Sequence, residues 1–277
     1  MKFQALSLVA AGLFGQSAAF MAPQFGGAKT TQLASTLADP SGGKIGAMGE
    51  QPQFMDIWVK LDPVVIQGGG MLRTWSLPTQ TEFAEVLMKT DDRTLNVNFD
   101  LWEGPDNTPQ SMKLYIGYGN KRPIRNIVAT PGDNNAFAIR NIGPLEYPVD
   151  ACVGLDEGSA GLESLVKSLT ENPDVGSLIQ GGSISNTPCE QAISSVAIMI
   201  KSDGRPVNAK IELLQGPNSV KISLDHYAED GLLRPLFLII QTPGAGNTVR
   251  IMNSAGQEFP FVAAVVPYRY GPDEWLL

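Results

Sequence analysis

Three side chains that could form a catalytic triad lie close together in the second half of the sequence: Ser223, Asp225 and His226. A triad needs groups that converge from separate elements. These three fall on one predicted strand, where neighbouring side chains point to opposite faces of the sheet. His226 is also the only histidine in the chain. We therefore expect His226 to be a structural residue at the edge of the core.

The two cysteines, Cys152 and Cys189, offer no further chemistry. Glu190 follows Cys189, and no histidine lies near either thiol in the sequence, so a thiol nucleophile lacks its base. One histidine and two cysteines cannot supply the four ligands of a His/Cys zinc site, and they exclude a disulfide scaffold. Aspartates at 91, 92 and 203 could bind Ca²⁺, but no EF-type loop surrounds them. No catalytic residue, metal or cofactor is expected.

Composition narrows the class of protein further. The 277 residues include 20 Lys and Arg against 28 Asp and Glu, a net charge of −8. An acidic chain with no basic tract is a poor ligand for nucleic acid or an anionic membrane. No apolar stretch reaches the roughly 20 residues of a membrane span. The 29 glycines and 20 prolines favour short strands joined by turns over long helices.

The first residues have the features of a targeting signal. Residues 1–19 have the layout of a signal peptide: Lys2, an apolar run, and small residues at a cleavage site. Residues 20–52 are hydroxylated and acid-poor, like a transit peptide and linker. The junction at Phe20 resembles the bipartite presequences of diatoms and related algae, which implies a plastid stroma destination. An ordinary secreted protein that begins at Phe20 is the alternative. We expect the folded part to begin near Phe54.

The strongest signal is an internal repeat. Three motifs occur once in each half, and the second and third recur at a constant spacing of 112 residues. A period of that length is a whole domain, so we interpret the chain as a tandem duplication. The predicted units are a repeat domain at 53–153, a helical linker at 154–177, a repeat domain at 178–268 and a tail at 269–277. The repeated residues are Gln67, Gly68, Gly69 with Gln180, Gly181, Gly182; Arg122 with Arg234; and Thr130, Pro131, Gly132 with Thr242, Pro243, Gly244.

Both copies have the alternating apolar and polar residues that are typical of β-strands. Apolar and polar residues alternate over 95–101 and again over 207–213, which predicts half-buried strands. The segments 124–129 and 236–241 are more continuously apolar, as in central strands, and each runs into Thr-Pro-Gly. The predicted fold is all-β: two tandem, duplicated antiparallel β-sandwich-like domains joined by a short amphipathic helix. That helix spans 159–169, with an apolar stripe at Leu162, Leu165, Val166 and Leu169. It should cover a sheet face or bridge the two domains.

Each repeated motif has a structural and a functional interpretation. The Gln-Gly-Gly segments lack the spacing of a phosphate loop, so their glycines more simply permit a bend. Arg122 and Arg234 could bind an anion, but an intramolecular or intersubunit salt bridge fits an acidic chain better.

The C-terminal tail has no counterpart in the first copy. It has aromatic and aliphatic side chains beyond the last predicted strand. These side chains either dock onto their own domain or insert into a neighbouring subunit. We expect deletion of 268–277 to leave both domains folded but stop assembly. The candidate assembly residues are Tyr268, Tyr270, Trp275, Leu276 and Leu277.

A presequence of this kind, followed by two β-rich domains that each carry Gln-Gly-Gly and Thr-Pro-Gly, resembles the diatom pyrenoid shell proteins. The resemblance covers the chain after the presequence. It implies a structural, self-assembling protein of the sheet that encloses the Rubisco matrix, where it supports CO₂ concentration and fixation. Its implied partners are further copies of itself in a sheet or tube, related shell proteins and the Rubisco matrix. The family offers no catalytic residues.

The rival class is a tandem β-sandwich that binds a ligand or carbohydrate through loops at one end. Such a protein should expose aromatic side chains in matching loops of both copies. Trp58, Trp75 and Trp102 have no tryptophan counterpart in the second copy. The sequence therefore favours the structural class, and an enzyme ranks third.

Overall fold

The computed structural model describes residues 51–155, 160–171 and 176–271, and these form a two-layer antiparallel β-sandwich. The presequence prediction and the end of the tail lie outside the described residues. The first half of the sequence supplies strands β1 (Val64–Ile66), β2 (Met71–Ser76), β3 (Phe83–Lys89), β4 (Leu95–Glu103), β5 (Asn107–Ile116), β6 (Ile124–Ala129), β7 (Asn135–Asn141) and β8 (Val149–Leu155). The second half supplies β9 (Ser177–Ile179), β10 (Ile184–Pro188), β11 (Ile193–Lys201), β12 (Val207–Gln215), β13 (Val220–Ala228), β14 (Leu236–Gln241), β15 (Asn247–Asn253) and β16 (Phe261–Tyr270).

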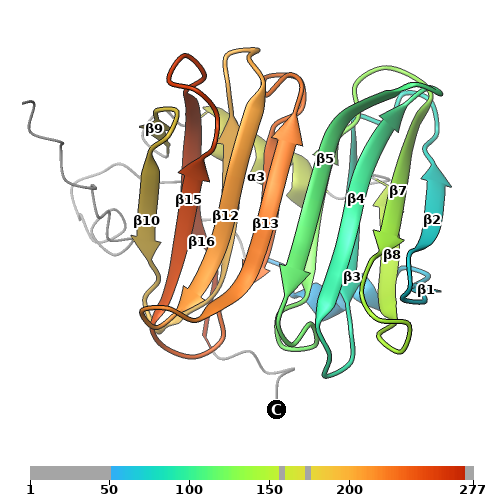
Figure 1. Ribbon diagram of the computed structural model, residues 1–277, viewed down its shortest axis with the longest axis horizontal. Coiled ribbons are helices and arrows are strands. Elements are labelled where there is room, and N and C mark those ends of the chain that lie inside the picture. Colours follow the sequence, from blue (N-terminus) through green and yellow to red (C-terminus); the bar gives the residue numbers. More distant parts are fainter. Residues whose placement is uncertain (1–50, 156–159, 172–175, 272–277) are drawn as a thin grey trace, which may run out of the picture.

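The strands form two eight-stranded sheets that each cross both halves of the chain (Figure 1). Sheet A has the order β1-β8-β3-β6-β14-β11-β16-β9, and sheet B has the order β10-β15-β12-β13-β5-β4-β7-β2. Each order reads the same from both ends when strands eight apart in number are taken as equivalents. A duplicated chain would give this arrangement, and the duplication itself stays an interpretation of the sequence.

The halves meet edge to edge in both sheets at once. Strand β6 pairs with β14, and Asn126 lies opposite Leu238, its own equivalent 112 residues later. Strand β5 pairs with β13, and Lys113 lies opposite Asp225, again its equivalent. An approximate two-fold axis therefore passes through both joints. The all-β sandwich prediction is confirmed, but the two predicted sandwiches are continuous through their sheets rather than joined by a helix alone.

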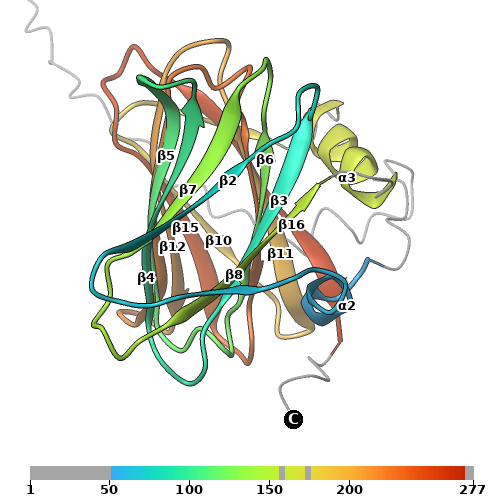
Figure 2. The same cartoon turned by 90° about the vertical axis from the view of Figure 1, so that its right-hand side faces the viewer.

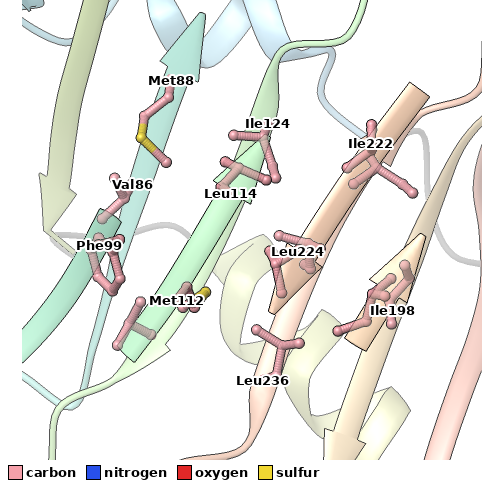
Figure 3. Close-up of a cluster of buried hydrophobic side chains, with 14 of the residues drawn as sticks. Val86, Met88, Phe99, Met112, Leu114, Ile124, Ile198, Ile222, Leu224 and Leu236 are labelled. Carbon is pink, nitrogen blue, oxygen red and sulfur yellow. The ribbon is translucent and has the colours of Figure 1, made fainter. Parts of the chain in front are cut away.

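The core lies between the sheets and crosses the joint without a break. Leu114 and Ile124 of the first half face the same interior as Leu224 and Leu236 of the second (Figure 3). All four side chains are almost fully buried. Since the apolar alternation of each strand points inward, one hydrophobic cluster serves both halves.

The two helices of the described residues lie on the outer face of sheet A (Figure 2). Helix α2 (Phe54–Trp58) packs Phe54 and Trp58 against Leu87 and Cys152. Helix α3 (Ala160–Glu171) follows β8 and buries Leu165 and Leu169 against a cluster drawn from both halves. The predicted apolar stripe is confirmed at Leu165, Val166 and Leu169, whereas the side chain of Leu162 lies outside the described residues. The outer face of sheet B carries no helix in the described part of the chain.

Candidate assembly surfaces

The Ser223, Asp225 and His226 group does not form a triad. All three lie on β13, where alternation turns Ser223 and Asp225 outward and His226 into the core. His226 is 2% exposed and lies opposite Met112 of β5. Neither ring nitrogen has a hydrogen-bond partner within the described structure. Burial lowers the pKa of His226 to about 3, so the ring stays neutral in the folded protein near pH 7.

His226→Leu should therefore remove part of the acid sensitivity of the fold. In the unfolded chain the histidine pKa is about 6.5, so between pH 3 and 6.5 the unfolded state binds the extra proton. The free energy of unfolding then falls by about 1.4 kcal/mol per pH unit below pH 6.5. Leucine, which the first half has at the equivalent position 114, cannot take up this proton. Urea denaturation of both proteins at pH 7 and pH 5 measures the difference, and equal pH slopes would contradict the assignment.

The cysteines and aspartates that could carry chemistry also lie in structural environments. Burial raises the pKa of Cys152 to about 12 and that of Cys189 to about 11, so both thiols stay protonated. Asp92 accepts a hydrogen bond from Asn120, and Asp203 pairs with Arg205 at 3.4 Å. The residues described here contain no cluster of three or more His, Cys, Asp or Glu side chains that could hold a metal ion. They also contain no helix long and apolar enough to cross a bilayer.

The Gln-Gly-Gly motifs are packing sites. A Cβ on Gly68 would lie 1.7 Å from the carbonyl oxygen of Pro144, and one on Gly181 would lie 1.8 Å from that of Gly256. Only glycine permits this approach of two backbones. The amides of Gly70 and Gly182 make equivalent bonds, to the carbonyls of residues 141 and 253, so the first half has one extra glycine in this turn. The extra residue accounts for the shift in repeat spacing between the first motif and the other two.

The Thr-Pro-Gly motifs are held by an asparagine that follows them. The Asn135 amide nitrogen donates to the carbonyls of Thr130, Pro131 and Gly132 at 3.1–3.3 Å. Asn247 makes the same three bonds to residues 242, 243 and 244 at 2.9–3.2 Å. Both asparagines are buried, so these bonds replace water at the turn.

The repeated arginines join the two halves. Arg122 Nη2 donates to Oε1 of Gln215 at 3.0 Å, and Arg234 Nη2 donates to Oε2 of Glu103 at 2.7 Å. Glu103 and Gln215 are themselves equivalents 112 residues apart, so the two contacts are reciprocal across the joint. We call these four residues the arginine clasp. Both arginines are about 5–6% exposed, and burial lowers the pKa of Arg122, whose partner is a neutral amide. The sequence allows an intramolecular salt bridge as one option but does not identify the partners of Arg122 and Arg234.

Glu103→Gln should make the second clasp contact resemble the first. We expect a loss of about 1–2 kcal/mol in the free energy of unfolding, because the buried Arg234 guanidinium loses its counter-charge. Asp106→Asn removes an exposed charge from the neighbouring turn and should change stability by less than about 0.5 kcal/mol. Urea titration gives both values. An equal cost of Glu103→Gln in an Arg234→Met background would show that the ion pair is not the cause.

The C-terminal tail divides into parts with different roles. Strand β16 continues to Tyr270, two residues past the predicted domain end, and Tyr268 is 6% exposed. The Tyr268 hydroxyl accepts a hydrogen bond from Arg125 Nη1 at 3.0 Å, and burial raises its pKa. Tyr268 therefore packs on its own chain, because the pairing of β16 with β11 places it in the buried cluster that contains Leu165 and Leu169 of α3. Its role as an assembly residue stays a prediction. Tyr270 is 53% exposed, and Trp275, Leu276 and Leu277 lie outside the described residues.

The two ends of the sandwich are open. At one end the sheets terminate in β1 and β2, and at the other in β9 and β10, with no further strand of the described chain beyond them. Edge strands present unpaired backbone donors and acceptors to another chain. Val65 on β1 is 49% exposed, and its repeat equivalent Leu178 on β9 is 60% exposed. Because β1 and β9 are only three residues long, the sequence pattern does not predict them.

Among the described residues, the exposed aromatic side chains are tyrosines rather than tryptophans. Trp58 is buried, and Trp75 and Trp102 are half-buried. A groove beside the end of β5 is lined by Tyr115, Tyr118 and Tyr147, together with residues 91–94. Arg93 lies over the ring of Tyr147, 5.0 Å from its centroid. Tyr115 has an equivalent in Tyr227 and Tyr147 in Phe259, whereas Tyr118 is replaced by Asp230 in the second half.

These features define a two-layer β-sandwich protein whose buried polar groups hold its own halves together and whose ends are open. A family profile described as "Diatom pyrenoid shell protein" matches residues 58–267. The chain belongs to the diatom pyrenoid shell protein family, as its sequence resemblance indicated.

Comparison with solved structures returns plant seed globulins at low similarity. The coconut allergen cocosin is 11% identical, with a TM-score of 0.18 over 76% of this chain and 77% of that one. Tomato vicilin is 9% identical, with a TM-score of 0.16 over 72% and 74% of the two chains. Procruciferin, an 11S globulin from Brassica napus, is 8% identical, with a TM-score of 0.16 over 81% and 87%. Similarities at this level carry no argument about function. None of the curated proteins compared with the chain matches it.

Proposed function

We propose that this chain is a structural protein that assembles with further copies of itself into the sheet around the Rubisco matrix of the diatom pyrenoid. It would act at the pyrenoid periphery in the plastid stroma, reached through the bipartite presequence, and would support CO₂ concentration and fixation. Its partners would be other copies, related shell proteins and the matrix. Family membership supports the shell role.

The open ends of the sandwich are the observation that carries self-assembly. Within the chain, two similar halves already join through the edges of both sheets at once. The ends of the molecule repeat the same kind of edge: two short strands, one from each sheet, with an exposed aliphatic residue on β1 and on β9. An end of one copy that pairs with the opposite end of the next makes a heterologous contact. Such contacts that do not close a ring extend without limit.

Charge at both ends should block this growth. The double variant Val65→Lys/Leu178→Lys places an ammonium group on each end strand, a device that natural edge strands use against pairing. We expect the variant to keep the fold, since both side chains are largely exposed, and to lose assembly. Light scattering and sedimentation of the purified protein measure the loss.

The matched control is Leu232→Lys/Leu233→Lys, because these two leucines are 61% and 53% exposed in the turn between β13 and β14, away from the ends. This control should assemble like the unaltered protein. Sheets formed equally well by the end variant would overturn the role of the ends.

A further inference from the structure

The outer face of sheet B differs in charge from the rest of the molecule. Among the strand residues whose side chains point outward on this face, five are cationic and three are acidic, whereas the whole chain has a net charge of −8. Glu212 already pairs with two of the cations, Lys210 and Arg250, at 3.4 Å. A locally positive face on an acidic protein favours an acidic partner. The five cations are Lys113, Arg140, Lys210, Lys221 and Arg250, and the three acids are Asp100, Glu212 and Asp225.

Exposed tyrosines lie among these cations, close to the joint between the halves. Tyr115 and Tyr227 are 43% and 42% exposed on β5 and β13, and Tyr118 is 57% exposed in the turn after β5. Within the described residues, Lys113 and Lys221 have no salt bridge. Lys113 lies opposite Asp225 in the pairing of β5 with β13. We call Lys113, Tyr115, Tyr118, Lys221 and Tyr227 the tyrosine–lysine surface. Tyrosine and cationic side chains together are typical anchors of protein interfaces.

The backbone at Tyr118 adds an independent sign of function. Its φ is 60°, a left-handed conformation that is uncommon outside glycine. Tyr118 in this conformation lines the groove together with Tyr115 and Tyr147. The equivalent position in the second half is Asp230, which instead accepts hydrogen bonds from the amides of Leu232 and Leu233. The first half therefore has a feature that the fold alone does not require.

The C-terminal segment of another copy matches this surface in charge and in side-chain type. Residues 272–277 read Pro-Asp-Glu-Trp-Leu-Leu, and they follow Tyr270 at the end of β16. Asp273 and Glu274 would complement the lysines, and Trp275 would pack against the tyrosine rings. Asp91 and Asp92 line the groove, so the acidic residues of the segment belong on the lysine side and the tryptophan in the groove.

We propose that residues 272–277 of one copy dock on the tyrosine–lysine surface of a second copy. This inference rests on the proposed self-assembly and names a second contact for it, distinct from the sandwich ends. The contact is heterologous and gives the assembly a direction, because the segment occurs once per chain.

Photo-crosslinking of the full chain tests this contact. Trp275→benzoylphenylalanine is introduced into the chain, and equal amounts of ¹⁴N- and ¹⁵N-labelled protein are mixed before illumination. Mass spectrometry should find crosslinks from position 275 to residues 111–118 and 220–227, in peptide pairs of mixed isotope. Crosslinks to other surfaces, or only between peptides of one isotope, would overturn the proposal.

Charge reversal adds a quantitative readout. Lys113→Glu/Lys221→Glu should lower the crosslink yield about tenfold, because like charges then face each other. Lys60→Glu/Lys167→Glu is the matched control, since both lysines are exposed on α3 or beside α2. An equal fall in both variants would overturn the contact. Sheets that form without crosslinks at this surface would sink this inference and leave the proposed function standing; crosslinks without sheets would do the reverse.

Discussion

Arg125→Met is expected to lower the free energy of unfolding by about 3–5 kcal/mol, the usual cost of leaving a buried charge without its partner. Arg125 Nε lies 2.7 Å from Oε2 of Glu85, and the two side chains are 6% and 8% exposed. Arg125 also donates to the Tyr268 hydroxyl, which links β6 to β16. One substitution thus leaves a buried carboxylate and a buried phenol without a donor.

A second variant separates charge from packing. Glu85→Leu/Arg125→Met replaces the buried pair with apolar side chains, a change that is often close to neutral. Urea denaturation should therefore show most of the lost stability restored. Asp203→Asn is the comparison at an exposed ion pair, in which the side chains of Asp203 and Arg205 are 65% and 49% exposed. It should lower the free energy of unfolding by less than about 1 kcal/mol. A double variant as unstable as the single one would show that lost packing, and not the uncompensated Glu85 charge, caused the loss.

A chain that ends at Gly271 is expected to fold normally and to form no extended sheets. The truncation leaves the whole of β16 in place, including Tyr268 in the core, and removes only residues 272–277. A deletion that started at Tyr268 would also remove the end of a strand paired with β11, so its loss of assembly would be ambiguous.

Electron microscopy and thermal denaturation of the truncated chain measure assembly and folding separately. Trp275→Phe in the intact chain is the control, because it keeps an aromatic anchor and should still assemble. Sheets of normal extent from the truncated chain would contradict a role of the segment in assembly.

The sequence predicts the innermost strands of the sheets well and the edge strands poorly. Strands β6 and β14 have the bounds expected from their largely apolar segments, because both faces of a central strand are buried. Strands β1, β2, β9 and β10 escape prediction because each lies at the edge of a sheet and buries little of its surface. These are the strands that form the open ends.

Several roles of single residues depend on distant partners. The repeat alignment shows that Arg122 and Arg234 are equivalent, but only the fold brings them to Gln215 and Glu103 in the opposite half. From the sequence, Tyr268 is both the last residue of the second predicted domain and a candidate assembly residue. Its burial follows from the pairing of β16 with β11, which extends beyond the apolar run. His226 matches Leu114 in the repeat, and this match correctly indicated a structural position.

The most direct test of the proposed shell role is negative-stain electron microscopy of purified residues 51–277, without any other protein. Extended sheets or tubes with a regular repeat are the predicted result, since open ends and a C-terminal segment in every copy supply contacts that do not close. Monodisperse particles of constant size over a wide range of protein concentration would contradict self-assembly and favour a tandem β-sandwich that binds a ligand.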